Sequence, residues 1–307
     1  MKLEKLQKPL FFVLAAACLI PGISPGTALV TGILFGLLLK NPFAETGSVW
    51  SRNLLQIAVI MLGFGLSLAE VVSQAWASLP VTVVGISLTI FLGYLFGTWL
   101  KMEPRLAKLI AFGTAICGGS AIAAMAPAIK ARDEETSVSL ATVFSLNSVA
   151  LLIFPVIGKW LKMSQHDFGV WAGLAIHDTS SVVGAASHYG ATALAVATTV
   201  KLARALWITP FVIVSSYFSG SRQTNVFPWF IFGFIAAALT RTMLPAHESL
   251  WATLVAIGRQ LLVLSMFLIG TKLSIETLKK VGLSPLLLGL ILWLSASIFS
   301  YLAIGSL

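Results

Sequence analysis

The sequence has few charged side chains. Only 10% of its 307 residues are Asp, Glu, Lys or Arg, whereas a soluble domain carries about 25%. This composition leaves too little polar surface to cover a soluble all-helical protein with a large core. The shortage of charge therefore indicates a protein whose surface faces lipid.

Cysteine is almost absent as well. The two cysteines, Cys18 and Cys117, both lie in apolar runs, so they form no disulfide framework. The sequence also lacks a metal-binding spacing of Cys and His, and it lacks a nucleotide-binding loop. We therefore expect no cofactor and no metal, and the missing nucleotide motif disfavours an ATP-driven pump.

Apolar residues, in contrast, make up 58% of the chain. Apolar runs of about 20 residues recur along its whole length, which is typical of membrane-spanning helices. We predict an all-α polytopic membrane protein with about 11 transmembrane elements. They lie near residues 9–20, 26–40, 53–73, 80–100, 104–131, 136–160, 166–188, 191–219, 226–243, 250–272 and 283–306.

The net charge of +9 does not indicate nucleic-acid binding, because the basic residues sit in short loops between the predicted spans. Such loop charges orient a membrane protein, and they concentrate on the cytoplasmic side. A cytoplasmic N-terminus leaves few basic residues outside: Lys130, Arg132, Arg241 and Arg259. We therefore predict that the N-terminus is cytoplasmic.

The chain also resembles itself. The segment "SRNLLQIAVIMLGFGLSL" precedes "GRQLLVLSMFLIGTKLSI" by 207 residues, so that Arg52 and Gly63 match Arg259 and Gly270. The two spans are seven elements apart, an odd number, so the copies run in opposite directions. This predicts an inverted repeat, as in secondary transporters, although chance matching between Leu-rich helices is an alternative. We expect one transporter domain, 1–307, with repeat-related segments 26–100 and 226–306 around a central region, 104–219.

Two apolar helices are interrupted in the same way. "GTAICGGSAIAA" begins at Gly113 and "GLAIHDTSSVVGAAS" begins at Gly173; each breaks into small polar residues and then resumes. Freed backbone groups at membrane depth need protein or a water-filled cavity around them. We therefore predict two broken or re-entrant helices whose interruptions line one cavity.

Each interruption supplies groups that suit an anion. A helix that starts inside the membrane presents unpaired N–H groups and a positive dipole end. The alternatives are close helix packing through small residues and simple N-capping. The candidate substrate-binding residues of the two interruptions are Cys117, Gly118, Gly119, Ser120, His177, Asp178, Thr179, Ser180 and Ser181.

Ionisable and polar residues at membrane depth are costly and indicate function. His177 and Asp178 are the candidates for binding a coupling ion. Lys201 and Arg204, three apart in "VKLARALWITP", need an anionic partner, either Asp178 or a transported anion. An internal salt bridge, or one side chain reaching the membrane surface, is the alternative. Asn147 adds a polar notch to the neighbouring span and completes the candidate site.

The acidic stretch "ARDEETSVSLA" has a simpler interpretation. We expect Asp133, Glu134 and Glu135 to form a solvated loop that leads into a helix start, where carboxylates are favourable.

The run "AICGGSAIAA...PAI", the acidic turn after it, "GVWAGLAIHDTSSVVGAAS" and "VKLAR" together resemble the UPF0324-type membrane family, which carries the label sulfate exporter. The resemblance covers most of the chain and is strongest from about 105 to 210. It implies a multi-pass protein of the inner cell membrane, and it supports an anion as substrate.

These features together predict a secondary transporter that exports or exchanges a small anion, sulfate-like or sulfonate-like, by alternating access. The alternatives are an anion channel and, less favoured, an intramembrane thiol enzyme built from Cys117, His177 and Asp178; we expect no enzymatic activity. The expected partners are the small anion and the lipid bilayer. Homo-oligomerisation stays open, and no nucleic acid is expected.

Overall fold

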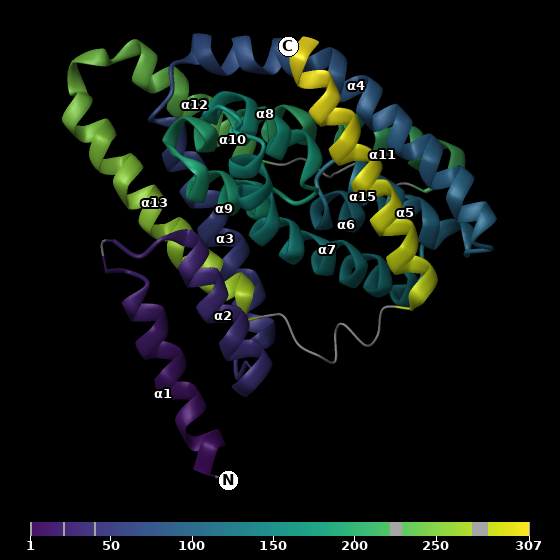
Figure 1. Ribbon diagram of the computed structural model, residues 1–307, viewed down its shortest axis with the longest axis horizontal. Helices are drawn as coiled ribbons and strands as arrows, with labels where there is room; N and C mark the ends of the chain where they lie inside the picture. Colours follow the sequence, from purple (N-terminus) through teal and green to yellow (C-terminus); the bar gives the residue numbers. More distant parts are fainter. Residues whose placement is uncertain (1, 21, 40, 222–228, 272–281, 307) are drawn as a thin grey trace. The chain divides into compact units, whose positions relative to one another are not determined.

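The computed structural model describes residues 2–20, 22–39, 41–221, 229–271 and 282–306 (Figure 1). Its described residues form helices and connecting turns, with no strand among them. The helices are α1 (Lys2–Ala17), α2 (Pro25–Leu39), α3 (Ala44–Gly63), α4 (Leu68–Trp99), α5 (Pro104–Ala115), α6 (Gly119–Ala128), α7 (Asp133–Trp160), α8 (Gln165–Ala175), α9 (Thr179–Tyr189), α10 (Ala191–Ala205), α11 (Ile208–Ser219), α12 (Trp229–Met243), α13 (Glu248–Gly270) and α15 (Leu283–Ala303), with short 3₁₀ turns η1 (Pro245–His247) and η2 (Ile304–Ser306).

Several helices are long and apolar enough to cross a membrane. Among the described residues there are five such segments: Leu68–Trp99, Asp133–Trp160, Ala191–Ser219, Pro245–Gly270 and Leu283–Ala303. Shorter apolar helices, including α2, α6 and α12, accompany them. The all-helical, polytopic class is therefore as the sequence predicts.

The expected spans 53–73 and 80–100 differ from the helices observed. α3 ends at Gly63, and α4 begins at Leu68 and runs without a gap to Trp99. Ser67 and Glu70 explain the new start. The Ser67 hydroxyl accepts from the Glu70 backbone N–H, and the Glu70 carboxylate accepts from the Ser67 backbone N–H. Pro80 lies inside α4 and does not end it. A membrane helix tolerates the loss of the one backbone donor that proline lacks.

The acidic stretch also differs in part from the expectation. Asp133 and Glu134 are exposed, but Glu135 is buried. Its carboxylate accepts from the Arg132 backbone N–H at 2.6 Å and from the Arg132 guanidinium at 3.0 Å. Glu135 therefore caps the start of α7 and is not a solvated loop residue.

The chain forms two compact units. The first comprises the described residues within Met1–Val72 and Trp229–Thr277, and the second those within Ser73–Pro228 and Leu278–Leu307. In the first unit, α3 and α13 pack antiparallel: Met61 lies against Gly258, while Gly65, further along the chain, lies against the earlier Val255. Phe64 and Trp251 stack beside them with ring centroids 5.2 Å apart.

Two glycines allow the helices of the first unit to approach closely. Gly63, at the end of α3, lies against Phe234 of α12, and Gly270, at the end of α13, lies against Leu29 of α2. These are the glycines that match across the 207-residue offset of the sequence. Each glycine therefore lets a backbone carbonyl oxygen of a neighbouring helix approach closely.

The second unit contains both interrupted helices. α7 packs against α5, α6 and α9, α10 packs against α8 and α9, and α15 packs against α5, α7 and α8. Both predicted interruptions are present: one lies between α5 and α6, the other between α8 and α9. This unit thus holds all the candidate site residues.

Candidate anion site at two interrupted helices

The two interruptions touch each other. Gly118 adopts a left-handed φ of 67°, which only glycine adopts freely. A Cβ atom at this position would lie 3.0 Å from the Cβ atom of Asp178 and 3.1 Å from its Cα atom. The backbone of the first interruption therefore packs directly on the second, and the glycine is required both by its φ and by this contact.

The remaining residues of the first interruption differ in their burial. Cys117 is buried, and Gly119 lies against the ring of Phe144 on α7. Ser120 is exposed in the first turn of α6. The N-cap residue of α6 is Gly118, which has no side chain to cap the helix, and the Cys117 thiol accepts from the Ala121 backbone N–H in the first turn.

The second interruption, in contrast, provides its own cap. The Asp178 carboxylate accepts from the Ser180 backbone N–H at 3.0 Å and also from the Ser180 hydroxyl. A carboxylate at this position complements the positive end of α9. Thr179, Ser180 and Ser181 are buried in the first turn, and Asp178 itself is partly exposed. The N-cap of α9 is therefore Asp178 and not one of the hydroxyl residues Thr179–Ser181, for which the sequence suggested capping.

Asn147 on α7 connects this interruption to a third helix. Its side-chain oxygen accepts from the Asp178 backbone N–H at 3.3 Å. Its side-chain nitrogen is buried and has no hydrogen-bond partner among the described residues. Both ring nitrogens of the buried His177 are likewise without one within the described part of the chain. Buried polar groups usually have a hydrogen-bond partner, so a bound molecule or ordered water would complete these groups.

Lys201 and Arg204 on α10 are buried and bind the opposite ends of the broken helices. Lys201 Nζ donates to the carbonyl oxygen of Ile176 at 2.7 Å. Arg204 Nε donates to Ala115 O at 2.7 Å, and its Nη1 donates to Leu174 O. The two cations thus offset the negative dipole ends of α5 and α8. Direct contact of either side chain with an anion stays a prediction.

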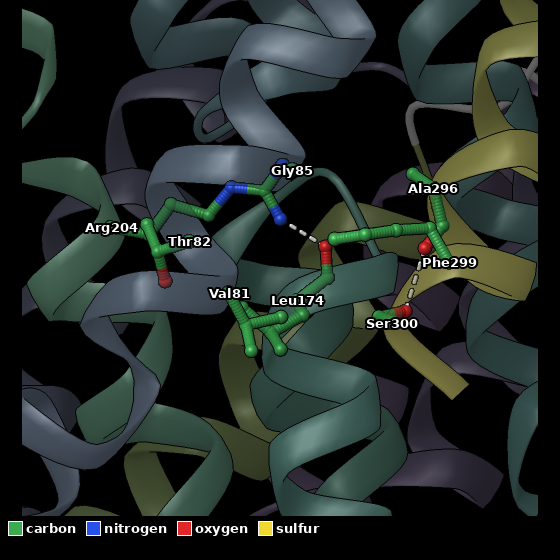
Figure 2. Close-up of a pocket in the computed structure, with 8 residues that line it drawn as sticks. All are labelled: Val81, Thr82, Gly85, Leu174, Arg204, Ala296, Phe299 and Ser300. Carbon is green, nitrogen blue, oxygen red and sulfur yellow. Dashed lines mark hydrogen bonds between the residues drawn. The ribbon is translucent and has the colours of Figure 1, made fainter. Parts of the chain in front are cut away.

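A small cavity lies beside Arg204 (Figure 2). It is lined by residues of α4, α8, α10 and α15: Val81, Thr82, Gly85, Leu174, Arg204, Ala296, Phe299 and Ser300. About 10 Å³ of it is open to the centre of a water molecule, which is enough for one water. The cavity reaches the carbonyl end of α8 through Leu174, and its lining contains no residue of the two interruptions.

Sequence reasoning missed the carbonyl groups of Ala115, Leu174 and Ile176. A usable signal was present, because a helix that breaks in the membrane exposes carbonyls on one side of the break as well as N–H groups on the other. Two cations on a nearby helix are natural partners for such carbonyls. From the sequence alone, the partners expected for Lys201 and Arg204 were anions.

Comparison with known proteins identifies the family. A family model described as Conserved hypothetical protein 698 matches residues 11–289. The UPF0324 membrane protein of Geobacter sulfurreducens is 50% identical over 301 residues, which are 98% of this chain and 97% of that one. The chain belongs to the UPF0324 membrane protein family. The UPF0324 protein of Bdellovibrio bacteriovorus is 46% identical over 96% of this chain and 93% of its own length.

The family assignment agrees with the resemblance seen in the sequence and shows that the chain is a membrane protein. The printed names of these UPF0324 relatives state a membrane location and no substrate. No solved structure matches the chain. The function must therefore be argued from the site itself.

Proposed function

We propose that the protein is a secondary transporter that moves a small anion across the inner cell membrane by alternating access. The observation that carries the proposal is the contact between the two interruptions, where Gly118 packs on Asp178. It brings the start of α6, whose N-cap residue is Gly118, next to the start of α9. Helix starts of this kind bind anions, because their N–H groups and dipoles favour negative charge.

The polarity of the surrounding groups supports an anion over a cation. Lys201 and Arg204 bind carbonyl oxygens at the ends of α5 and α8, so these oxygen atoms are already paired with cations. The groups that remain to be paired include the amide nitrogen of Asn147 and the hydroxyl of Thr114. We assign Asn147, Ser120 and the first turn of α6 to direct anion contact, and Lys201 and Arg204 to positioning the two breaks.

Alternating access is supported by the arrangement of the first unit. The antiparallel packing of α3 on α13, with Gly63 and Gly270 each against a backbone carbonyl oxygen of a neighbouring helix, fits the inverted repeat that secondary transporters use. The distribution of basic residues supports a cytoplasmic N-terminus.

The purified full-length chain in proteoliposomes tests the proposal. Uptake of a panel of small anions is measured with and without a pH gradient, and counterflow is measured with the same anion trapped inside. We expect saturable uptake that accelerates when anion is present on the opposite side. Uptake without saturation or counterflow would indicate a channel, and absence of uptake and binding for the whole panel would reject the anion proposal.

One variant separates transport from thiol chemistry. Cys117 is buried in the first interruption, where it packs and has no described route to a substrate. Cys117→Ala is expected to retain uptake, since a nucleophilic thiol has no role in the proposed transport. Loss of uptake in a variant that remains folded would favour the thiol-enzyme alternative.

A further inference from the structure

The charges around the two interruptions can be counted. Lys201 and Arg204 supply two buried cations, and Asp178 supplies one carboxylate. The two positive helix starts, at α6 and α9, are offset by the two negative helix ends, at α5 and α8. With both cations protonated, the group therefore carries one net positive charge.

The group also contains His177 and the Cys117 thiol, and both are counted as neutral. Other ionisable residues of the neighbouring helices lie away from the group in the chain. Those described on α5 to α9 and their connections lie toward the outer helix ends: Glu103, Arg105, Lys108, Lys130, Arg132, Asp133, Glu134, Glu135, Lys159, Lys162, His166, Asp167 and His188. Net charge is expensive to bury in a medium of low dielectric constant. One negative charge is therefore needed to complete the group.

The structure also indicates where that charge binds. The start of α9 is already occupied by the Asp178 carboxylate, whereas the N-cap residue of α6, Gly118, has no side chain to occupy the start of that helix. The Asn147 side chain gives independent evidence of a ligand. Its buried amide nitrogen lacks a partner among the described residues, while its oxygen accepts from the Asp178 backbone N–H. The contact between Gly118 and Asp178 brings this amide and the first turn of α6 to the same junction.

We propose that this site takes an anion with a single negative charge, such as a sulfonate, in preference to a doubly charged anion such as sulfate. The inference rests on the proposed function and specifies its substrate class. Asp178 acts as an internal anion that occupies one of the two helix starts. A doubly charged ligand would leave one negative charge unbalanced beside the Asp178 carboxylate.

Methanesulfonate and sulfate provide a matched pair of probes, because both present oxygens on a tetrahedral sulfur but differ by one charge. Binding is measured by ligand-dependent thermal stabilisation of the detergent-solubilised full chain, and competition by uptake into proteoliposomes. We expect methanesulfonate to bind the wild-type protein at least about tenfold more tightly than sulfate, because an unbalanced buried charge disfavours binding.

Changing Asp178 tests the origin of the preference. Asp178→Asn removes one negative charge and is expected to shift the ratio of affinities toward sulfate by about tenfold or more. The control is Asp133→Asn, the same substitution at an exposed residue in the first turn of α7, which should leave the ratio unchanged.

The possible outcomes are distinct. If wild-type protein binds sulfate as tightly as methanesulfonate or more tightly, the charge inference is wrong, whereas the proposed anion transport stands. An unchanged ratio in folded Asp178→Asn also overturns it. If neither probe nor any other anion of the panel binds, both proposals fail. If Asp178→Asn does not fold, the wild-type ratio alone decides.

Discussion

Arg204 donates from Nε to the carbonyl oxygen of Ala115, a residue 89 positions earlier in the chain, at 2.7 Å. Through Nη1 the same guanidinium also binds Leu174 O. One side chain of α10 therefore ties together the ends of α5 and α8, the helices that precede the two interruptions. This relationship makes α10 the element that fixes the distance between the breaks.

Removing the Arg204 guanidinium should destabilise the protein. Arg204→Gln leaves carbonyls at two helix ends without a charged donor, and hydrogen bonds to charged groups are worth about 1.5–3 kcal/mol each. We expect a lower unfolding temperature in detergent and a loss of anion-dependent stabilisation. Arg204→Lys should recover little of the lost stability, because an ammonium cannot reproduce the planar arrangement of donors in a guanidinium.

Lys159→Gln is the matched control, since it removes one positive charge at an exposed position on α7. Its unfolding temperature should stay close to that of wild type. If Arg204→Gln behaves like this control, the guanidinium does not hold the two helix ends.

Lys201→Ala should weaken anion binding, as its buried position predicts. We attribute the weaker binding to loss of the hydrogen bond from Lys201 Nζ to Ile176 O, because this bond positions the second interruption. We therefore expect weaker binding of every singly charged anion by a similar factor, and binding isotherms across the anion panel measure it. Unchanged affinities in folded Lys201→Ala would show that α10 does not position the site.

Gly118→Ala tests the contact between the interruptions. The added Cβ would meet Asp178 at 3.0 Å, and it would also strain a backbone held at φ 67°. Gly220→Ala is a control for a positive φ without a close contact, because Gly220 has φ 60° in the milder αL region and its nearest contact for a Cβ is 3.9 Å away. We expect Gly118→Ala to abolish anion uptake and Gly220→Ala to retain it; equal uptake by both variants would contradict the importance of the contact.

Asn147→Asp separates two roles of Asn147. The aspartate keeps an oxygen for the Asp178 backbone N–H, but it loses the unpaired donor and adds a negative charge. We therefore expect a folded protein with strongly weakened anion binding, measured by thermal stabilisation with methanesulfonate. Ser148→Ala, on the next residue of the same helix, is the control. Wild-type affinity in Asn147→Asp would exclude the amide nitrogen as a ligand.

Asp178→Asn also tests proton coupling. If a proton moves with the anion, Asp178 with His177 is its carrier, because a carboxylate is protonated more readily when desolvated and less readily beside a cation. The variant should then keep the binding of singly charged anions and lose the pH dependence of uptake. Flux across a pH series, beside wild type, provides the measurement. An unchanged pH profile would leave Asp178 as the N-cap of α9.

Gly63→Ala tests the close packing in the first unit. A Cβ there would lie 2.6 Å from the carbonyl oxygen of Phe234 and 3.1 Å from Ala237 Cβ, so α3 and α12 must separate. We expect destabilisation of about 1–3 kcal/mol, measured by unfolding in detergent. Gly305→Ala is the control, because a Cβ at Gly305 meets nothing within 4 Å. Equal stability of the two variants would show that this packing is loose.

The sequence by itself determined the membrane class, the helical content and the positions of the two interruptions. These features depend on local composition, because long apolar runs form helices in lipid and stretches such as "CGGS" and "HDTSS" break them. The sequence also singled out Lys201, Arg204 and Asn147, since polar residues stand out in apolar spans. It misplaced the boundary between α3 and α4, where the reciprocal cap of Ser67 and Glu70 outweighed the continuous hydropathy.

Only the tertiary structure decided which groups meet. Periodicity gives no information on whether Lys201 faces an anion, a carboxylate or a carbonyl, and all three partners satisfy a buried ammonium. The structure places Ile176 O there and assigns the Asp178 carboxylate to the start of α9. Such pairings join residues as much as 90 positions apart, and they depend on the packing of whole helices, which local composition does not specify.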